Sequence, residues 1–242
     1  MLLRILLSFS LSKYLDCKNK EKYNNTVIDN GVINDERTKY MAVKDHSLDE
    51  KIIKAAKEEF MQYGFQKASL HKIAQNAGLT TGALYTRYKN KDALFCSLMA
   101  NVMEAFRTNA EPLRERYYAV EKSRNIEELI RVMEDERSIY LDILFEYYDE
   151  CKLFFCHSVG SSIETNMEKM MQVKADETIA FLKRISKTQV DLNGVEMILK
   201  GQFQFYHQIL QKGYSKEEAV RCMETVELFF EAGWKKLFEE II

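Results

Sequence analysis

Residues 79–91, LTTGALYTRYKNK, bring hydroxyl, small and basic side chains together in a chain of 242 residues whose formal net charge is −2. Threonine and tyrosine hydroxyls can form hydrogen bonds with phosphates or base edges, and lysine and arginine neutralise phosphates. Glycine and alanine let a large partner come close to the backbone. The combination indicates a binding surface for a polyanion.

The charge distribution along the chain supports this interpretation. Residues 41–95 carry nine Lys/Arg against six Asp/Glu, whereas residues 96–242 carry nineteen against twenty-six. A basic segment followed by an acidic one predicts a local binding site for a polyanion. It does not predict non-specific binding over the whole surface.

Short helices must position these side chains, because the chain is rich in apolar residues at three-to-four spacing and has a single proline, which predicts an all-α fold. Ser69 can open one helix and Gly78 can end it, and Thr80 can cap another helix two residues later. Two short helices joined by so tight a turn form a helix-turn-helix over residues 69–88.

The second helix of this motif is expected to enter the major groove of DNA. Leu84 and Tyr88 point inward, so Thr81 and Ala83 can meet base edges. Tyr85 and the basic residues that follow can reach phosphates. The expected DNA contacts are Ser69, Thr80, Thr81, Gly82, Ala83, Tyr85, Arg87, Lys89 and Lys91.

Residues 47–99 resemble the DNA-binding domain of the tetracycline-repressor (TetR) family of bacterial transcription regulators, through AAKEEFMQYGF, KIAQNAGLTTGALYTRYKNKDALF and the spacing between them. Ala68, Lys72 and Arg87 stand where the family usually has threonine, an acid, and histidine or tyrosine. These departures bear on operator preference. The resemblance implies a cytoplasmic homodimer on a palindromic operator of double-stranded DNA, and we expect a repressor that a small-molecule effector releases.

Three sections are expected along the chain. Residues 1–40 are expected to be a disordered leader or an upstream mis-start before Met41, since the polar, Asn-rich part has no helical pattern. Residues 46–106 form the DNA-binding domain, and residues 107–242 form a helical effector-binding and dimerisation domain. No stretch approaches the ~20 apolar residues of a membrane span.

Two long helices are expected in the body, over residues 91–109, ending before Pro112, and over residues 125–155. A ligand bound in the body would act through the first of them. It would change the distance between the two recognition helices of a dimer and so release the DNA.

The last helix carries apolar residues at alternating spacings of four and three, and Gly233 permits close helix approach. With the preceding helix it predicts a four-helix interface between two copies, and burial within a single subunit is the alternative. The expected interface residues are Phe203, Val226, Phe229, Phe230, Gly233 and Trp234.

Methionine and aromatic residues are concentrated in the middle helices. Most are expected to be core, and a subset can line an adaptable ligand cavity. The candidates are Met103, Tyr140, Tyr148, Phe154, His157, Met167, Met171 and Tyr206. The sequence does not indicate which ligand they would bind.

Catalysis is not expected, because there is no glycine-rich phosphate loop, no paired carboxylates in a plausible cleft and no metal motif. We expect no cofactor and no metal, since Cys151, Cys156 and His157 lack a fourth ligand at a recognisable spacing. Five dispersed cysteines fit a reducing compartment. The alternative function is a DNA-binding protein that recruits a protein partner, without a small-molecule effector.

Overall fold

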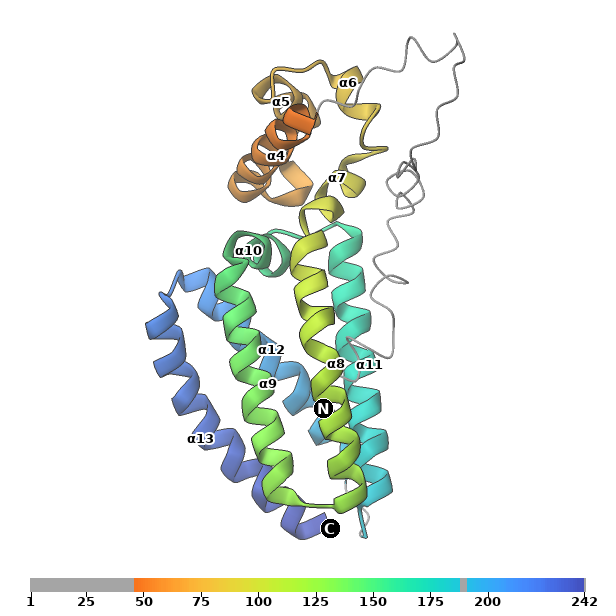
Figure 1. The fold of residues 1–242 in the computed structure, drawn as a ribbon, viewed down its shortest axis with the longest axis vertical. Helices are drawn as coiled ribbons and strands as arrows, with labels where there is room; N and C mark the ends of the chain where they lie inside the picture. The colour runs from red at the N-terminus through yellow and green to blue at the C-terminus, as the bar shows by residue number, and fades with distance from the viewer. Residues whose placement is uncertain (1–45, 188–190, 242) are drawn as a thin grey trace, which may run out of the picture.

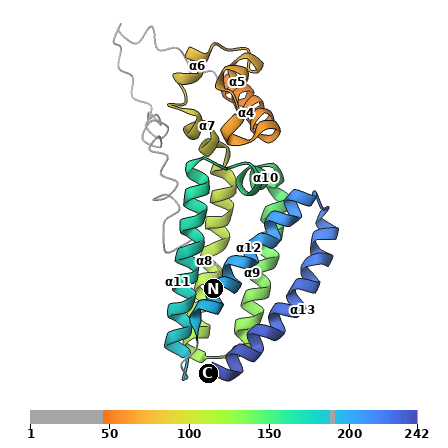
Figure 2. The same ribbon diagram turned by 180° about the vertical axis from the view of Figure 1, so that it is seen from behind.

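The computed structural model describes residues 46–187 and 191–241, where ten helices, α4 to α13, are present and no strand occurs (Figure 1). A small N-terminal unit stands at one end of an elongated helical body, as both views show (Figure 1 and Figure 2). The all-α prediction is confirmed. The expectation for residues 1–40 lies outside the described residues. Among the residues described, no helix is long and apolar enough to span a membrane.

The N-terminal unit consists of α4 (His46–Lys67), α5 (Leu70–Asn76) and α6 (Thr81–Tyr85). The helical path of α4 is interrupted at Gly64, whose φ of 69° and ψ of 168° suit glycine. Apolar side chains from all three helices meet in one core. They include Ile52, Ala56, Phe60, Ile73, Ala74 and Leu84.

Side-chain caps define the helix-turn-helix. The Ser69 Oγ accepts a hydrogen bond from the backbone N–H of Lys72 at 3.4 Å, and the Thr80 Oγ1 accepts one from the N–H of Ala83 at 3.1 Å. Gly78 lies in the turn between them with a φ of 73°. Both predicted helix starts are therefore confirmed, and they place α6 immediately after a tight turn.

The predicted single helix over residues 91–109 is wrong, because the chain forms α7 (Lys91–Leu98) and α8 (Ala100–Ser123) with a break at Met99. The prediction that it ends before Pro112 is also wrong. A proline inside a helix costs about 3 kcal/mol or more. Here the helix continues because the turns beyond the proline bury apolar side chains and bond to α9, where the Tyr117 hydroxyl donates to Glu136 at 2.6 Å.

The rest of the body consists of α9 (Ile126–Glu146), α10 (Tyr148–Cys156), α11 (Ser162–Ile185), α12 (Leu192–Lys212) and α13 (Lys216–Ile241). In both views α8 runs beside α9 and α11, and α13 lies on the outer side of α9 (Figure 1 and Figure 2). The short α10 lies at the end of the body that faces the N-terminal unit.

The predicted helix over residues 125–155 is wrong as well, because the backbone leaves the helical region at Tyr147 (φ −114°, ψ 45°). The break turns α10 so that Cys151, Leu153 and Phe154 are buried. In this orientation α10 packs against both α12 and α4, which a straight continuation of α9 would not reach. Burial of apolar side chains therefore outweighs local helix propensity here.

Two contacts join α4 to the α10 end of the body. The ammonium group of Lys57 lies 2.5 Å from Glu150 Oε1. The backbone N–H of Phe65, just after the kink in α4, donates to the carbonyl oxygen of His157 at 2.8 Å. The first of these is a charge pair, and the second is a backbone hydrogen bond that sets the distance between the two segments.

A third contact joins α7 to the start of α11. Asp92 accepts two hydrogen bonds from Ser162, from its backbone N–H at 2.8 Å and from its hydroxyl at 2.7 Å. The proposed domain boundary between residues 106 and 107 falls inside α8, which is continuous there. The DNA-binding unit and the body thus share α8. They are also linked by the contacts of α4 with the α10 end of the body and by the contact of α7 with α11.

Candidate functional site

The outward face of α6 carries the residues predicted to read DNA. Leu84 and Tyr88 are buried and anchor the helix to the N-terminal core, as expected. Gly82 is exposed, Tyr85 is 51% exposed, and Thr81 and Ala83 are half-buried. The side chains in the middle of this face are therefore small, and a side chain with a hydroxyl group lies at either end of it.

Gly82 is not required by the packing of the chain itself. A Cβ at this position would meet Thr80 Oγ1 at 3.8 Å, an ordinary van der Waals contact. Glycine within a helix costs about 1 kcal/mol relative to alanine. Since nothing in this chain explains the cost, the residue fits a surface that another molecule approaches closely.

The structure places Arg87 within the N-terminal unit. Its Nε donates to Asp49 Oδ1 at 2.9 Å, and both side chains are half-buried. The ion pair ties the segment after α6 to the first turns of α4. The sequence predicts that Arg87 contacts a phosphate, whereas in the structure its guanidinium group pairs with this aspartate.

Lys91 is also engaged inside the unit. Its ammonium group donates to the carbonyl oxygens of Gln66 at 2.9 Å and Ala68 at 3.2 Å, and it lies 4.9 Å from the centre of the Phe65 ring. It therefore closes the C-terminal end of α4, where carbonyl groups lack partners in the helix. Lys89, two residues earlier, is exposed.

Replacing Lys91 with alanine is expected to lower the free energy of unfolding by about 1–3 kcal/mol, because two charge-assisted hydrogen bonds disappear. The measurement is urea unfolding followed by circular dichroism. Lys89→Ala is the matched control and should unfold at the same urea concentration as the wild type. Equal stability of the two variants would show that the Lys91 contacts do not support the fold.

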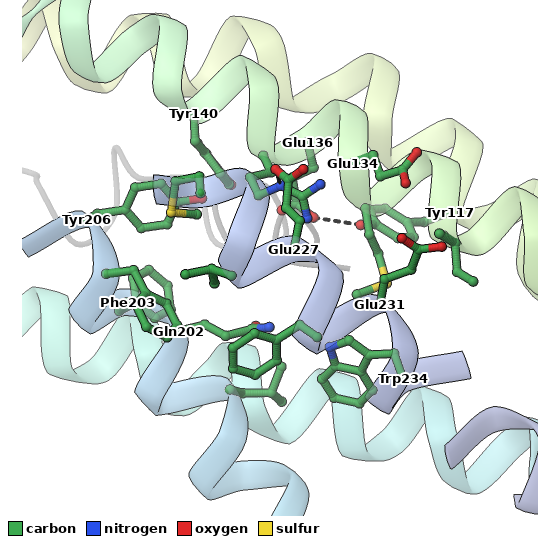
Figure 3. A pocket seen from close by; sticks show the side chains of 18 of the residues that line it. Tyr117, Glu134, Glu136, Tyr140, Gln202, Phe203, Tyr206, Glu227, Glu231 and Trp234 are labelled. Atoms are coloured by element: carbon green, nitrogen blue, oxygen red, sulfur yellow. Dashed lines mark hydrogen bonds and ion pairs between the residues drawn. The ribbon is translucent and has the colours of Figure 1, made fainter. Parts of the chain in front are cut away.

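The body holds a cavity of about 80 Å³ between α9, α12 and α13 (Figure 3). Of the residues predicted to bind a ligand, Tyr140 and Tyr206 line it. The other six lie outside its lining, on α8, α10 and α11 and just after α10. They are Met103, Tyr148, Phe154, His157, Met167 and Met171. Helical periodicity indicates which side chains face inward on each helix. It does not indicate between which helices a cavity remains.

Cys151 and His157 belong to the junction beside α4. Burial raises the pKa of the Cys151 thiol to about 12, so the thiol stays protonated at neutral pH. Burial, and then the positive charge of Lys152, lowers the pKa of His157. No group of three His, Cys, Asp or Glu side chains within residues 46–187 and 191–241 could hold a metal ion.

Trp234 was predicted at the dimer interface, but it has little exposed surface to offer a second copy. The side chain is 4% exposed in a single chain, where it stacks on Phe238 with ring centroids 5.7 Å apart. Phe203, Val226 and Phe230 are half-buried and line the cavity. The sequence pattern does not distinguish a stripe that faces the subunit's own cavity from one that faces a second copy.

Other apolar residues of α12 and α13 remain exposed. Phe229 is 75% exposed, Leu228 and Met197 are similarly open, and Gly233 is exposed. Exposed large apolar side chains such as Leu228 and Phe229, which are adjacent in sequence, are typical of an interaction surface. This part of the predicted interface stays a prediction.

Residues 52–98 match the family described as "Bacterial regulatory proteins, tetR family". The chain is 30% identical over 71 residues to the uncharacterized HTH-type transcriptional regulator YhgD of Bacillus subtilis (strain 168), which is 28% of this chain and 37% of that protein. It is 35% identical over 72 residues to the fatty acid metabolism regulator protein of the same organism, 29% of this chain and 37% of that protein. The matched region thus spans little more than a third of these relatives.

The fold extends the likeness beyond the N-terminal unit. The crystal structure of NalD, the secondary repressor of the MexAB-OprM multidrug efflux pump in Pseudomonas aeruginosa, aligns over 81% of this chain and 96% of that one. The TM-score is 0.53 and the sequence identity is 18%, so the comparison concerns the fold alone. Residues 52–98 and the helix-turn-helix that they build therefore match the TetR family of bacterial regulatory proteins.

Proposed function

We propose that this chain is a sequence-specific DNA-binding transcriptional regulator that works as a homodimer on a palindromic operator, as a repressor. The observation that carries the proposal is the outward face of α6, capped by Thr80 and built from small and hydroxyl-bearing residues. Such a face allows a short helix to lie deep in the major groove. The family match supports the same conclusion, because its members are regulators and not enzymes.

The residues divide into two roles. Thr81 and Ala83 read base edges, while Tyr85 and Lys89, both exposed, hold the phosphate backbone. The Ser69 and Thr80 oxygens accept backbone N–H groups as helix caps, and each hydroxyl proton remains available to a phosphate. Gly82 lets the DNA come close to the helix backbone. Arg87 and Lys91 act mainly by positioning α6 and α7.

Changing Thr81 to valine is expected to weaken binding to the operator by about 1–3 kcal/mol, because valine has nearly the same volume but no hydroxyl for the base edge. Binding to a scrambled duplex should barely change. The operator is first obtained by selecting bound genomic fragments, and both duplexes are then titrated at two salt concentrations. Thr108→Val, an exposed threonine on α8, is the matched control. If operator and scrambled affinities fell equally, Thr81 would not contact bases.

The cavity supports release by a small molecule over the alternative, in which a partner protein is recruited and the body is solidly packed. Its wall on α9 leads through the break at Tyr147 into α10, and α10 reaches α4 through the Glu150–Lys57 ion pair. A ligand that favours one position of α9 would thereby favour one position of α4 and of the attached recognition helix. This route replaces the uninterrupted helix 91–109 that the sequence led us to expect.

A further inference from the structure

Eight of the nineteen residues that line the cavity between α9, α12 and α13 are aromatic (Figure 3). Tyr140 of α9 and Tyr206 of α12 meet edge to face, with ring centroids 6.1 Å apart. Phe205 and Phe230 form a second such pair, 5.7 Å apart, between α12 and α13. Aromatic faces carry negative partial charge, and each attracts a nearby cation by about 0.5–2 kcal/mol, with the higher values where water is excluded.

The charged groups around the cavity are predominantly acidic. Four of the residues that line it are glutamates and one is an arginine. Arg137 forms an ion pair with Glu227 through its Nε, so its charge is largely offset within the wall. Glu134, Glu136 and Glu231 then leave the lining negative, and Figure 3 shows them on the same side as Glu227.

Glu136 is the most deeply placed of these carboxylates, with 2% of its surface exposed. The hydroxyl of Tyr117 donates to its Oε2 at 2.6 Å and so holds its orientation. Burial, and then the negative charge of Glu136, raises the pKa of Tyr140 far above its ordinary value, so that phenol stays neutral. A carboxylate held in an apolar wall attracts a cation more strongly than one in water does.

Trp234 provides an independent sign of a ligand. Its side chain is buried, and its indole N–H has no acceptor among the described residues. In Figure 3 the ring nitrogen lies on the edge that faces the cavity. A buried donor without a partner costs about 1–3 kcal/mol. An oxygen acceptor on a bound molecule would satisfy it.

We propose that this cavity binds a small organic cation, an amine or quaternary ammonium group attached to an aromatic or bulky apolar body that carries a hydrogen-bond acceptor. The cationic group lies against Glu136, and the apolar body lies between the aromatic walls. An anionic ligand, such as a carboxylate, would face the same glutamates and be repelled. The proposal rests on the proposed ligand-responsive function and specifies the class of its effector.

Trp234 makes the proposal directly measurable, because it is the single tryptophan among 242 residues and lines the cavity. The full chain is titrated with benzyltrimethylammonium, with its uncharged carbon isostere neopentylbenzene, and with the anion phenylacetate, while tryptophan fluorescence is recorded. The cation is expected to shift the emission with a Kd about tenfold or more below that of the isostere, and the anion to bind most weakly.

Glu136→Gln removes the charge but keeps the size and an oxygen that can accept from Tyr117. We expect it to weaken binding of benzyltrimethylammonium about tenfold and to leave the neutral isostere unchanged. Glu224→Gln, an exposed change on α13 outside the lining, should leave both unchanged. Equal cation affinity in Glu136→Gln and wild type, tighter binding of the anion, or no probe-induced change at Trp234 would each overturn the proposal.

Operator binding by the protein without any probe is measured in parallel and keeps the two proposals separate. Retained operator binding with no response to the cation would refute the ligand class and leave the regulator intact. Cation binding by a protein that binds no operator would refute the regulator and leave the ligand class intact.

Discussion

Replacing Phe229 with glutamate is expected to yield a monomer that has lost specific operator binding. The side chain is 75% exposed in the single chain, and its neighbour in sequence, Leu228, is also exposed on α13. If two copies pack there, the change buries a charge without a partner, which is strongly unfavourable. One helix-turn-helix makes too few base contacts for specificity, whereas two make a matched pair on half-sites one turn of DNA apart.

The size of the effect follows from the difference between specific and non-specific binding, which is typically 10³-fold or more. We expect a loss of about 10³-fold for the operator, down to a weak and strongly salt-dependent level. Analytical ultracentrifugation gives the oligomeric state, and fluorescence anisotropy gives the affinities at fixed salt.

The control for Phe229→Glu is Val159→Glu, which places the same charge on an exposed apolar site in the segment between α10 and α11, outside α12 and α13. It should remain dimeric. A tight Phe229→Glu dimer would move the interface to another face of the body. It would leave the assignment of α6 to DNA untouched.

Replacing Phe95 with alanine is expected to cause the largest loss of stability, about 3–5 kcal/mol. Phe95 is fully buried on α7 and forms edge-to-face contacts with Phe60 at 4.9 Å and Phe65 at 5.2 Å between ring centroids. These three rings join both sides of the α4 kink to α7. Their loss removes apolar burial and the aromatic contacts together.

The unfolding of Phe95→Ala can be followed separately in the two parts of the molecule. Trp234 lies in the body, so its fluorescence reports on the body, whereas circular dichroism reports on all helices. At equal protein concentration, the dichroism transition should begin at lower urea than the fluorescence transition. Tyr85→Ala, an aromatic-to-alanine change on the exposed face of α6, should leave both transitions in place. A loss below about 1 kcal/mol for Phe95→Ala would contradict its assigned role in the core.

Local signals in the sequence were sufficient for the helix-turn-helix and for several helix starts. Ser69, Thr80 and Asn125 each cap a helix by accepting an N–H three residues ahead. Ser215 and Glu218, a serine and a glutamate three residues apart, form the reciprocal pair of hydrogen bonds that is typical of this spacing at a helix start. These hydrogen bonds close within one helical turn, so residue type and spacing are enough to predict them. The inward direction of Leu84 likewise follows from the helical period.

The roles of the basic residues were decided by contacts between segments far apart in the chain. Lys91 binds carbonyl groups 23 and 25 residues earlier, and Arg87 pairs with Asp49, 38 residues earlier. From the sequence alone both were simply positive charges near a recognition helix. Which acceptor each one meets depends on how α4 packs against α6 and α7, and that packing is a property of the assembled unit.

The site in the body was decided by tertiary structure to a still greater degree. The breaks at Met99 and Tyr147 and the continuation of α8 through Pro112 each depend on burial against neighbouring helices, which outweighs local propensity. The cavity combines Glu136 and Tyr140 of α9 with Tyr206 of α12 and Trp234 of α13. Of these residues, the sequence pattern identified Tyr140 and Tyr206 as candidates for the lining, assigned Trp234 to the interface with a second copy, and gave no sign of Glu136. Whether the inward faces meet in a solid core or leave a space is set by the angles between helices, which side-chain packing determines only once the whole body is assembled.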